Sequence, residues 1–131
     1  ASVRRALAMA VDNAIVLELG YNNLGVVAEN HHVCQIHPEY AQLPKPINDP
    51  AGALKIMQDE GMADFEHELV SFDDGFNKDT TDALAAQLRD AGLKVKRVVL
   101  PWATYWNDWA KFPFSSTEWA HRPLGVQVLV L

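Results

Sequence analysis

The feature that most constrains the fold of this chain is a strand–helix–strand pattern in its second half. Residues 65–72 (FEHELVSF) alternate between two faces, as a strand does, and residues 93–101 (LKVKRVVLP) form a second run anchored by valines and ended by proline. Between them lies an apolar pattern of helical spacing, capped near Asp79 or Thr80 and ended by Gly92. Two strands joined in this way are predicted to lie parallel in one sheet, with a right-handed connection.

The first half of the chain is predicted to be helical, with one long interruption. Residues 21–48 contain several prolines and few periodic apolar positions, so they are expected to form a loop, and loops of this length are usually functional or disordered. Three helices are predicted. The first spans residues 3–11. The second is capped by Asp12 or Asn13 and ends at Gly20, and the third is capped by Asp49 and ends at Gly61.

Beyond the strand–helix–strand unit, the pattern predicts three short elements. Residues 104–112 are predicted to form a helix. Trp102, Trp106 and Trp109 have the i, i+4, i+7 spacing of one helical face, and such a face is more often core than ligand platform. Residues 114–119 (FSSTEW) are predicted to form a third strand. The last run, VQVLVL, also favours a strand because it is rich in β-branched residues.

The bulk properties narrow the function. A net charge of −6 argues against a nucleic-acid partner, whose phosphates require a basic surface, and favours a monomer kept soluble by its own charge. The chain opens on a helical pattern and closes on an apolar run. We therefore expect residues 1–131 to be a single partial domain of a longer protein.

Three segments resemble one protein family. The first helix pair, VRRALAMAVDNAIV, is similar to the pair that opens the C-terminal lobe of extracytoplasmic solute-binding proteins of the peptide/nickel class, family 5. DPAGALKIMQDEG resembles the next helix of that lobe. The long segment from TTDALAAQLRDAG to STEWAHRPLG resembles the helix, strand and short helix that lead to a tryptophan of the ligand cleft. The order of the three motifs is that of the family, and together they cover nearly the whole chain.

The resemblance implies a fold and a function. The fold would be α/β, one lobe of a periplasmic-binding-protein type II fold, with a mixed sheet and a βαβ unit flanked by helices. The protein would be the periplasmic capture subunit of an ABC importer, closing two lobes on a small solute or peptide and presenting it to the membrane permease. The family usually places a helix after the cleft tryptophan, which conflicts with the strand expected for VQVLVL.

The same resemblance assigns the first candidate site. Trp119 matches the cleft tryptophan, and His121 and Arg122 follow it where peptide-binding members carry an aspartate for the ligand's amino terminus. An arginine in a partly dry cleft attracts an anion and repels an ammonium, and its planar fork suits a carboxylate or phosphate. We therefore expect a ligand with an acidic or acceptor-rich group. The alternative is that Trp119 belongs to the core and Arg122 forms a surface ion pair with Glu118.

The second candidate site is the segment ENHHVCQIHPEY, residues 29–40. Asn30, His31 and His32 are predicted to form a polar edge of the solute pocket, with Cys34 and Ile36 packed beneath them. One alternative is an exposed loop without function. The other is a nickel or zinc carrier that uses the histidines and cysteine, but their spacing matches no established zinc signature, and we expect no metal.

The remaining alternative is an α/β enzyme, and the sequence contains little evidence of catalytic residues. Ser115 and Ser116 lack a Gly-x-Ser-x-Gly context, and Asp73 and Asp74 are adjacent acids that a turn explains. Glycine-rich phosphate loops are absent. We therefore expect a binding protein without catalytic residues or a cofactor.

Overall fold

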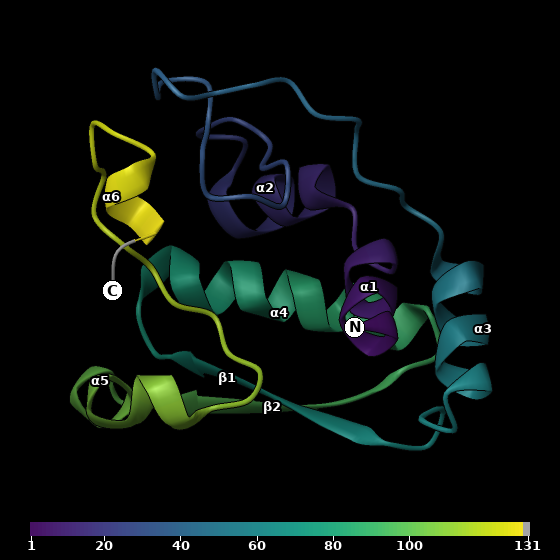
Figure 1. The fold of residues 1–131 in the computed structure, drawn as a ribbon. Coiled ribbons are helices and arrows are strands. Elements are labelled where there is room, and N and C mark those ends of the chain that lie inside the picture. Colours follow the sequence, from purple (N-terminus) through teal and green to yellow (C-terminus); the bar gives the residue numbers. More distant parts are fainter. Residues whose placement is uncertain (130–131) are drawn as a thin grey trace.

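The computed structural model describes residues 1–129, and it confirms the α/β organisation (Figure 1). Strands β1 (Glu66–Phe72) and β2 (Lys94–Leu100) pair in parallel and are joined by α4 (Gly75–Asp90). No helix among these residues is both long and apolar enough to cross a membrane. The remaining elements are α1 (Ser2–Met9), α2 (Asn13–Tyr21), α3 (Pro50–Asp59), α5 (Trp102–Asp108), the 3-10 helix η1 (Trp109–Lys111) and α6 (Val126–Leu129).

The helices form layers over one face of the sheet. Helix α4 covers this face, and Leu69 of β1, Val95 of β2 and Leu88 of α4 belong to one buried cluster, which α1 and α3 extend at the far end. Figure 1 shows α2 on the side of α4 that faces away from the sheet. The corner between α1 and α2 is fixed to α4 by two hydrogen bonds, because the Asp12 N–H donates to Gln87 Oε1 at 2.8 Å and Gln87 Nε2 donates to the Asp12 carbonyl at 3.2 Å.

The opposite face of the sheet carries a smaller aromatic core. Tyr105 and Phe72 are both fully buried, with ring centroids 5.1 Å apart. Trp106 and Trp109 pack partly buried against this cluster, whereas Trp102 is 56% exposed. The prediction of three core tryptophans is therefore wrong for Trp102. Helix α5 ends at Asp108, so the three tryptophans do not lie on one regular helical face. The buried residue of α5 is Tyr105.

The predicted third strand is reduced to a single bridge. Ser115 pairs with Val70 of β1 in parallel, and the bridge is made by two main-chain bonds: Val70 N–H to the Phe114 carbonyl, 3.1 Å, and Ser116 N–H to the Val70 carbonyl, 2.9 Å. Strand pairing does not continue to Trp119. Both neighbours of β1 run parallel to it.

Two predicted helix boundaries are corrected. Helix α4 begins at Gly75 rather than near Thr80, because the Thr80 hydroxyl donates to the Phe76 carbonyl at 2.6 Å inside the helix instead of capping it. Helix α2 runs past Gly20 and ends at Tyr21, and its C-cap Asn22 takes the left-handed conformation that asparagine tolerates. Residues 21–48 form the predicted loop, without a helix or strand between α2 and α3.

The conflict over the last segment is partly settled. Val126–Leu129 form the short helix α6, as the family resemblance implied, and not a strand. Residues 130 and 131 of the VQVLVL run lie outside the described residues.

Gly20 allows α2 to approach α4, which yields a prediction about stability. A Cβ at this position would lie 2.4 Å from Thr80 Cγ2 and 2.5 Å from Thr80 Cα. Gly20→Ala should destabilise the protein by about 1–3 kcal/mol, although alanine favours a helix by about 1 kcal/mol. Urea denaturation measures this, with Gly25→Ala as control, because a Cβ there meets only Leu17 Cδ1 at 3.6 Å. Equal stability of the two variants would show that the helices do not need this close approach.

Candidate functional site

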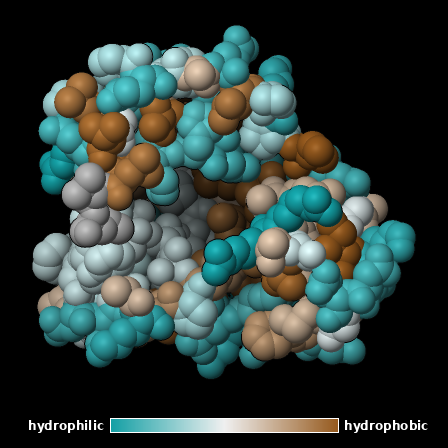
Figure 2. Space-filling view, in the orientation of Figure 1, coloured by the Kyte–Doolittle hydropathy of each residue, from teal (hydrophilic) through white to brown (hydrophobic). Residues whose placement is uncertain are grey.

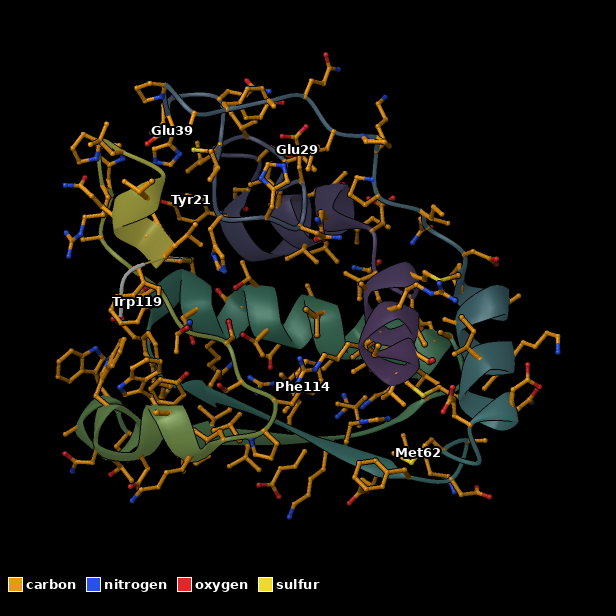
Figure 3. The ribbon with its side chains drawn as sticks, in the orientation of Figure 1. Tyr21, Glu29, Glu39, Met62, Phe114 and Trp119 are labelled. Carbon is orange, nitrogen blue, oxygen red and sulfur yellow. The ribbon has the colours of Figure 1, made fainter. Side chains whose placement is uncertain are left out.

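Trp119 lies at the carboxyl-terminal end of the parallel strands, beside α5 (Figure 3). Its ring meets Trp106 and Trp109 edge-on, with centroids 6.0 Å and 5.3 Å away, yet half of the side chain stays exposed. Edge-to-face packing of this kind holds an aromatic ring in a defined orientation. The carboxyl ends of parallel strands are also where α/β proteins bind their ligands. Trp119 therefore presents a fixed, accessible aromatic surface.

His121 and Arg122 follow in the connection to α6, and both are exposed. Within residues 1–129, the Arg122 side chain has no hydrogen bond or ion pair, so the predicted alternative of an ion pair with Glu118 does not form. The backbone is held instead, because the Arg122 carbonyl lies 2.9 Å from His37 Nε2. The guanidinium is therefore available to bind an anionic ligand.

The three polar residues predicted for the pocket edge have different environments. Asn30 has a positive φ of 62°, and its Oδ1 accepts a hydrogen bond from Asn13 Nδ2 at 2.7 Å. His31 Nε2 lies 3.5 Å from a Glu29 carboxylate oxygen, whereas His32 is exposed. The side chains of Asn30 and His31 therefore contribute to the internal structure of the loop, and His32 is left free to meet a ligand.

The packing expected beneath this edge is wrong. Cys34 is exposed and Ile36 is 65% exposed, whereas His37 is buried with 7% of its surface accessible. His37 accepts a hydrogen bond from the Cys34 N–H at 2.9 Å, and its Nδ1 lies 3.5 Å from Cys34 Sγ. The sequence contains no local signal for the burial of His37, because this burial depends on Arg122, a residue 85 positions away.

The structure brings the two candidate segments together, but through other residues than those predicted. His37 contacts the Arg122 carbonyl, and Glu39 Oε2 accepts a hydrogen bond from the Gly125 N–H at 3.0 Å. Figure 3 shows Glu39 beside the turn that precedes α6. No group of three or more histidine, cysteine, aspartate or glutamate side chains in residues 1–129 is arranged to hold a metal ion.

A largely apolar cavity lies elsewhere. It has a volume of about 600 Å³, and it is lined by α1, α4, the start of β1 and Phe114; of the predicted residues only Asn30 reaches it. In Figure 3, Phe114 and Met62, which line it, lie apart from Trp119, and Figure 2 shows apolar side chains around a hollow in this face of the molecule. We assign the candidate site to Trp119 and Arg122 rather than to this cavity, whose lining also includes Arg4, Glu66 and Glu68, because Trp119 lies at the carboxyl ends of the parallel strands, where α/β proteins bind their ligands.

The sequence profile of the family described as "Bacterial extracellular solute-binding proteins, family 5 Middle" matches residues 1–126. The chain therefore belongs to this family of solute-binding proteins. Among curated proteins, no sequence match reaches significance.

Several solved structures share the fold of this chain. NikA from Brucella suis, in complex with Fe(III)-EDTA, superposes with a TM-score of 0.77 at 17% identity, over 93% of this chain and 28% of its own. The oligopeptide-binding protein AppA from Bacillus subtilis, with a nonapeptide, gives 0.74 at 17% identity over 94% of this chain and 28% of its own. AgaA from A. tumefaciens R10, with agropinic acid, gives 0.75 at 23% identity over 88% and 25%.

These superpositions confirm the fold class: the chain has the α/β fold of part of a periplasmic-binding-protein type II lobe. The chain spans about a quarter of the length of these structures, as the covered shares of 28%, 28% and 25% show.

His67 lines the apolar cavity and yields a prediction about pH. It is 6% exposed, its Nε2 has no hydrogen-bond partner in residues 1–129, and burial lowers its pKa. The folded state therefore takes up fewer protons than the unfolded chain, so stability should fall as the pH drops from the ordinary histidine range towards the lower folded pKa. Above that range the titration of His67 no longer changes stability.

His67→Gln removes this titration. Between pH 7.5 and pH 5 the variant should lose less stability in urea denaturation than the wild type, whereas His32→Gln, at an exposed histidine, should follow the wild type. Parallel curves for wild type and His67→Gln would mean that His67 is not buried in its neutral form.

Proposed function

We propose that this chain is part of the substrate-binding component of an ABC importer, which captures a small solute or peptide-like ligand between two lobes. Membership in family 5 supports this function. The observation that carries it is the exposed face of Trp119, held by Trp106 and Trp109 at the carboxyl ends of the strands and followed by an unpaired Arg122. A second lobe would cover this surface when the ligand binds, and the ligand contacts of both lobes would favour the closed state.

The partners and location follow from this role. The protein works in the periplasm as a monomer and delivers its solute to the permease subunits of the importer. It has no nucleic-acid partner, which agrees with its net charge of −6. The family is one of binding proteins, and the proposed mechanism needs no bond chemistry and no cofactor.

The ligand carries an acidic or acceptor-rich group that meets Arg122, while Trp119 packs against its apolar part. His121, Asn30, His31 and His32 complete the polar edge of the pocket. A free-amino peptide is disfavoured, because no acidic residue follows Trp119 up to residue 131 to pair with its ammonium. AgaA was solved with agropinic acid, so this fold accommodates an acidic ligand.

Arg122→Ala in the full-length protein tests the anion contact. A charge-assisted hydrogen bond contributes about 1.5–3 kcal/mol, so affinity for an acidic solute should fall roughly 10- to 100-fold. Acidic metabolites and peptides are first screened by thermal shift, and calorimetry then measures Kd. Arg5→Ala, an exposed arginine of α1, is the control and should bind as the wild type does. Unchanged affinity of Arg122→Ala would remove this arginine from the site.

Trp119→Ala tests the aromatic surface with a matched control. Trp102 is 56% exposed and also contacts Trp106, with centroids 6.0 Å apart, but it lies at the start of α5. Loss of stacking on Trp119 should weaken binding of the solute from the same screen about tenfold, the order expected for one aromatic contact, whereas Trp102→Ala should leave Kd unchanged. Equal effects of the two substitutions would place the ligand elsewhere.

The carrier and enzyme alternatives have their own signatures. Nickel or zinc that stays bound in stoichiometric amount after dialysis, and is lost in His32→Ala, would favour the metal carrier. Turnover of a bound solute would favour the enzyme. Saturable binding without either result supports the importer subunit.

A further inference from the structure

The His37 side chain bridges two distant segments, and its hydrogen bonds define its protonation. Its Nδ1 lies 2.9 Å from the Cys34 backbone nitrogen, which can only donate. Nδ1 is therefore the acceptor, and the proton of the neutral ring must sit on Nε2. Nε2 lies 2.9 Å from the Arg122 carbonyl, which can only accept. Both partners therefore select the same tautomer, so each ring nitrogen of this buried histidine has a hydrogen-bond partner.

Glu39 makes a second bond to the same segment. Its Oε2 accepts from the Gly125 N–H at 3.0 Å, and this bond is the main reason that the pKa of Glu39 is lowered. Gly125 also sits close against the loop, because a Cβ there would lie 2.9 Å from Val33 Cγ2. The loop side is ordered by its own main-chain bonds, His37 N–H to the Cys34 carbonyl at 2.9 Å and Tyr40 N–H to the His37 carbonyl at 3.0 Å.

The groups that face His37 are those of its own loop and of the segment it holds. The Glu39 carboxylate and Cys34 Sγ approach it from the loop side. From the other segment, the His121 ring lies nearly parallel to it, with centroids 6.3 Å apart and an interplanar angle of 12°. His121 is therefore placed by the same contact that fixes the Arg122 carbonyl.

We propose that His37 and Glu39 form a clasp that positions the His121–Arg122 backbone for ligand binding. This inference rests on the proposed function, because it assigns these two residues a part in the same site. Neither residue needs to touch the solute. The clasp fixes the backbone on both sides of Pro123, so the exposed Arg122 side chain starts from a defined point. Ordering the backbone before binding reduces the entropy that the ligand would otherwise have to offset.

Two substitutions at one position separate the long-range bond from the local one. In His37→Asn, the amide oxygen stands where Nδ1 was and can accept from the Cys34 N–H, but the side chain is too short to reach the Arg122 carbonyl. In His37→Gln, the amide nitrogen stands where Nε2 was and can donate to that carbonyl. If His37 only fills space, His37→Gln and His37→Asn should disorder the segment around Arg122 equally. If the hydrogen bond to the Arg122 carbonyl matters, His37→Gln should keep the order of that segment and His37→Asn should lose it.

Amide hydrogen exchange in the full-length protein measures the clasp without any ligand. In His37→Asn the protection of the Gly125 amide should fall about tenfold, in keeping with the loss of one hydrogen bond, while amides in α4 keep their protection. His37→Gln should stay within about twofold of the wild type. Glu39→Ala should expose the Gly125 amide in the same way. Unchanged protection in His37→Asn, or equal loss in both His37 variants, would overturn the clasp.

The tautomer gives an independent check. Nitrogen NMR of the wild-type imidazole should show His37 protonated on Nε2 and not on Nδ1. A proton on Nδ1 at neutral pH would overturn the proposal, because that nitrogen could no longer accept from the Cys34 N–H.

Calorimetry with succinate as a dicarboxylate probe connects the clasp to binding. His37→Asn should weaken succinate several-fold, and His37→Gln should bind it as the wild type does. If the wild type does not bind succinate, the anion specificity assigned to Arg122 fails for this class of probe. The exchange and NMR results still decide whether the clasp exists, so the two proposals can fail separately.

Discussion

The candidate site depends on two main-chain hydrogen bonds that join Val70 to Phe114 and Ser116. They attach the segment that leads to Trp119 to the edge of β1 that is not paired with β2. The Ser116 carbonyl then accepts from the Tyr105 hydroxyl at 2.9 Å, which ties the same segment to α5. Without this attachment, the chain after α5 would have no fixed path across the sheet, and the aromatic ring would not lie at the carboxyl ends of the strands.

The sheet is held in place by a second polar network, on its helix-covered face. Arg97, with only 10% of its side chain exposed, donates to the Leu69 carbonyl, to Ser71 Oγ and to Asp82 Oδ1, each at 2.9 Å. Burial tends to raise the pKa of Asp82, but its hydrogen bonds from Lys78 and Arg97 prevail and lower it. One guanidinium thus joins β1, β2 and α4 at the middle of the sheet, where Arg97 pairs with Leu69. A buried charge with all of its partners present fixes geometry more than it adds stability.

What could be predicted from the sequence is what short-range periodicity determines. The alternation in β1 and the helical spacing in α4 define the βαβ unit. Elements whose conformation depends on distant partners were predicted less well. The stretch after Phe114 has strand propensity but pairs only with Val70, and Trp102, the first residue of α5, is exposed although the tryptophan spacing predicted a buried face. Trp119 was predicted as a site residue from a family motif. The burial of His37 could not be predicted in this way, because it depends on residue 122 folding back onto the loop.

In the loop of residues 29–40, His37 cannot both keep its structural hydrogen bonds and coordinate a metal ion. For His37 to coordinate a metal, it would have to release either the Cys34 N–H or the Arg122 carbonyl, because each ring nitrogen has a partner. Releasing Cys34 leaves a donor unsatisfied, and releasing Arg122 detaches the segment that carries the proposed anion contact. His31 is next to Glu29, which leaves His32 as the exposed imidazole of the loop. A cluster that suggests a metal carrier in the sequence thus becomes, in three dimensions, the support of the proposed solute-binding surface.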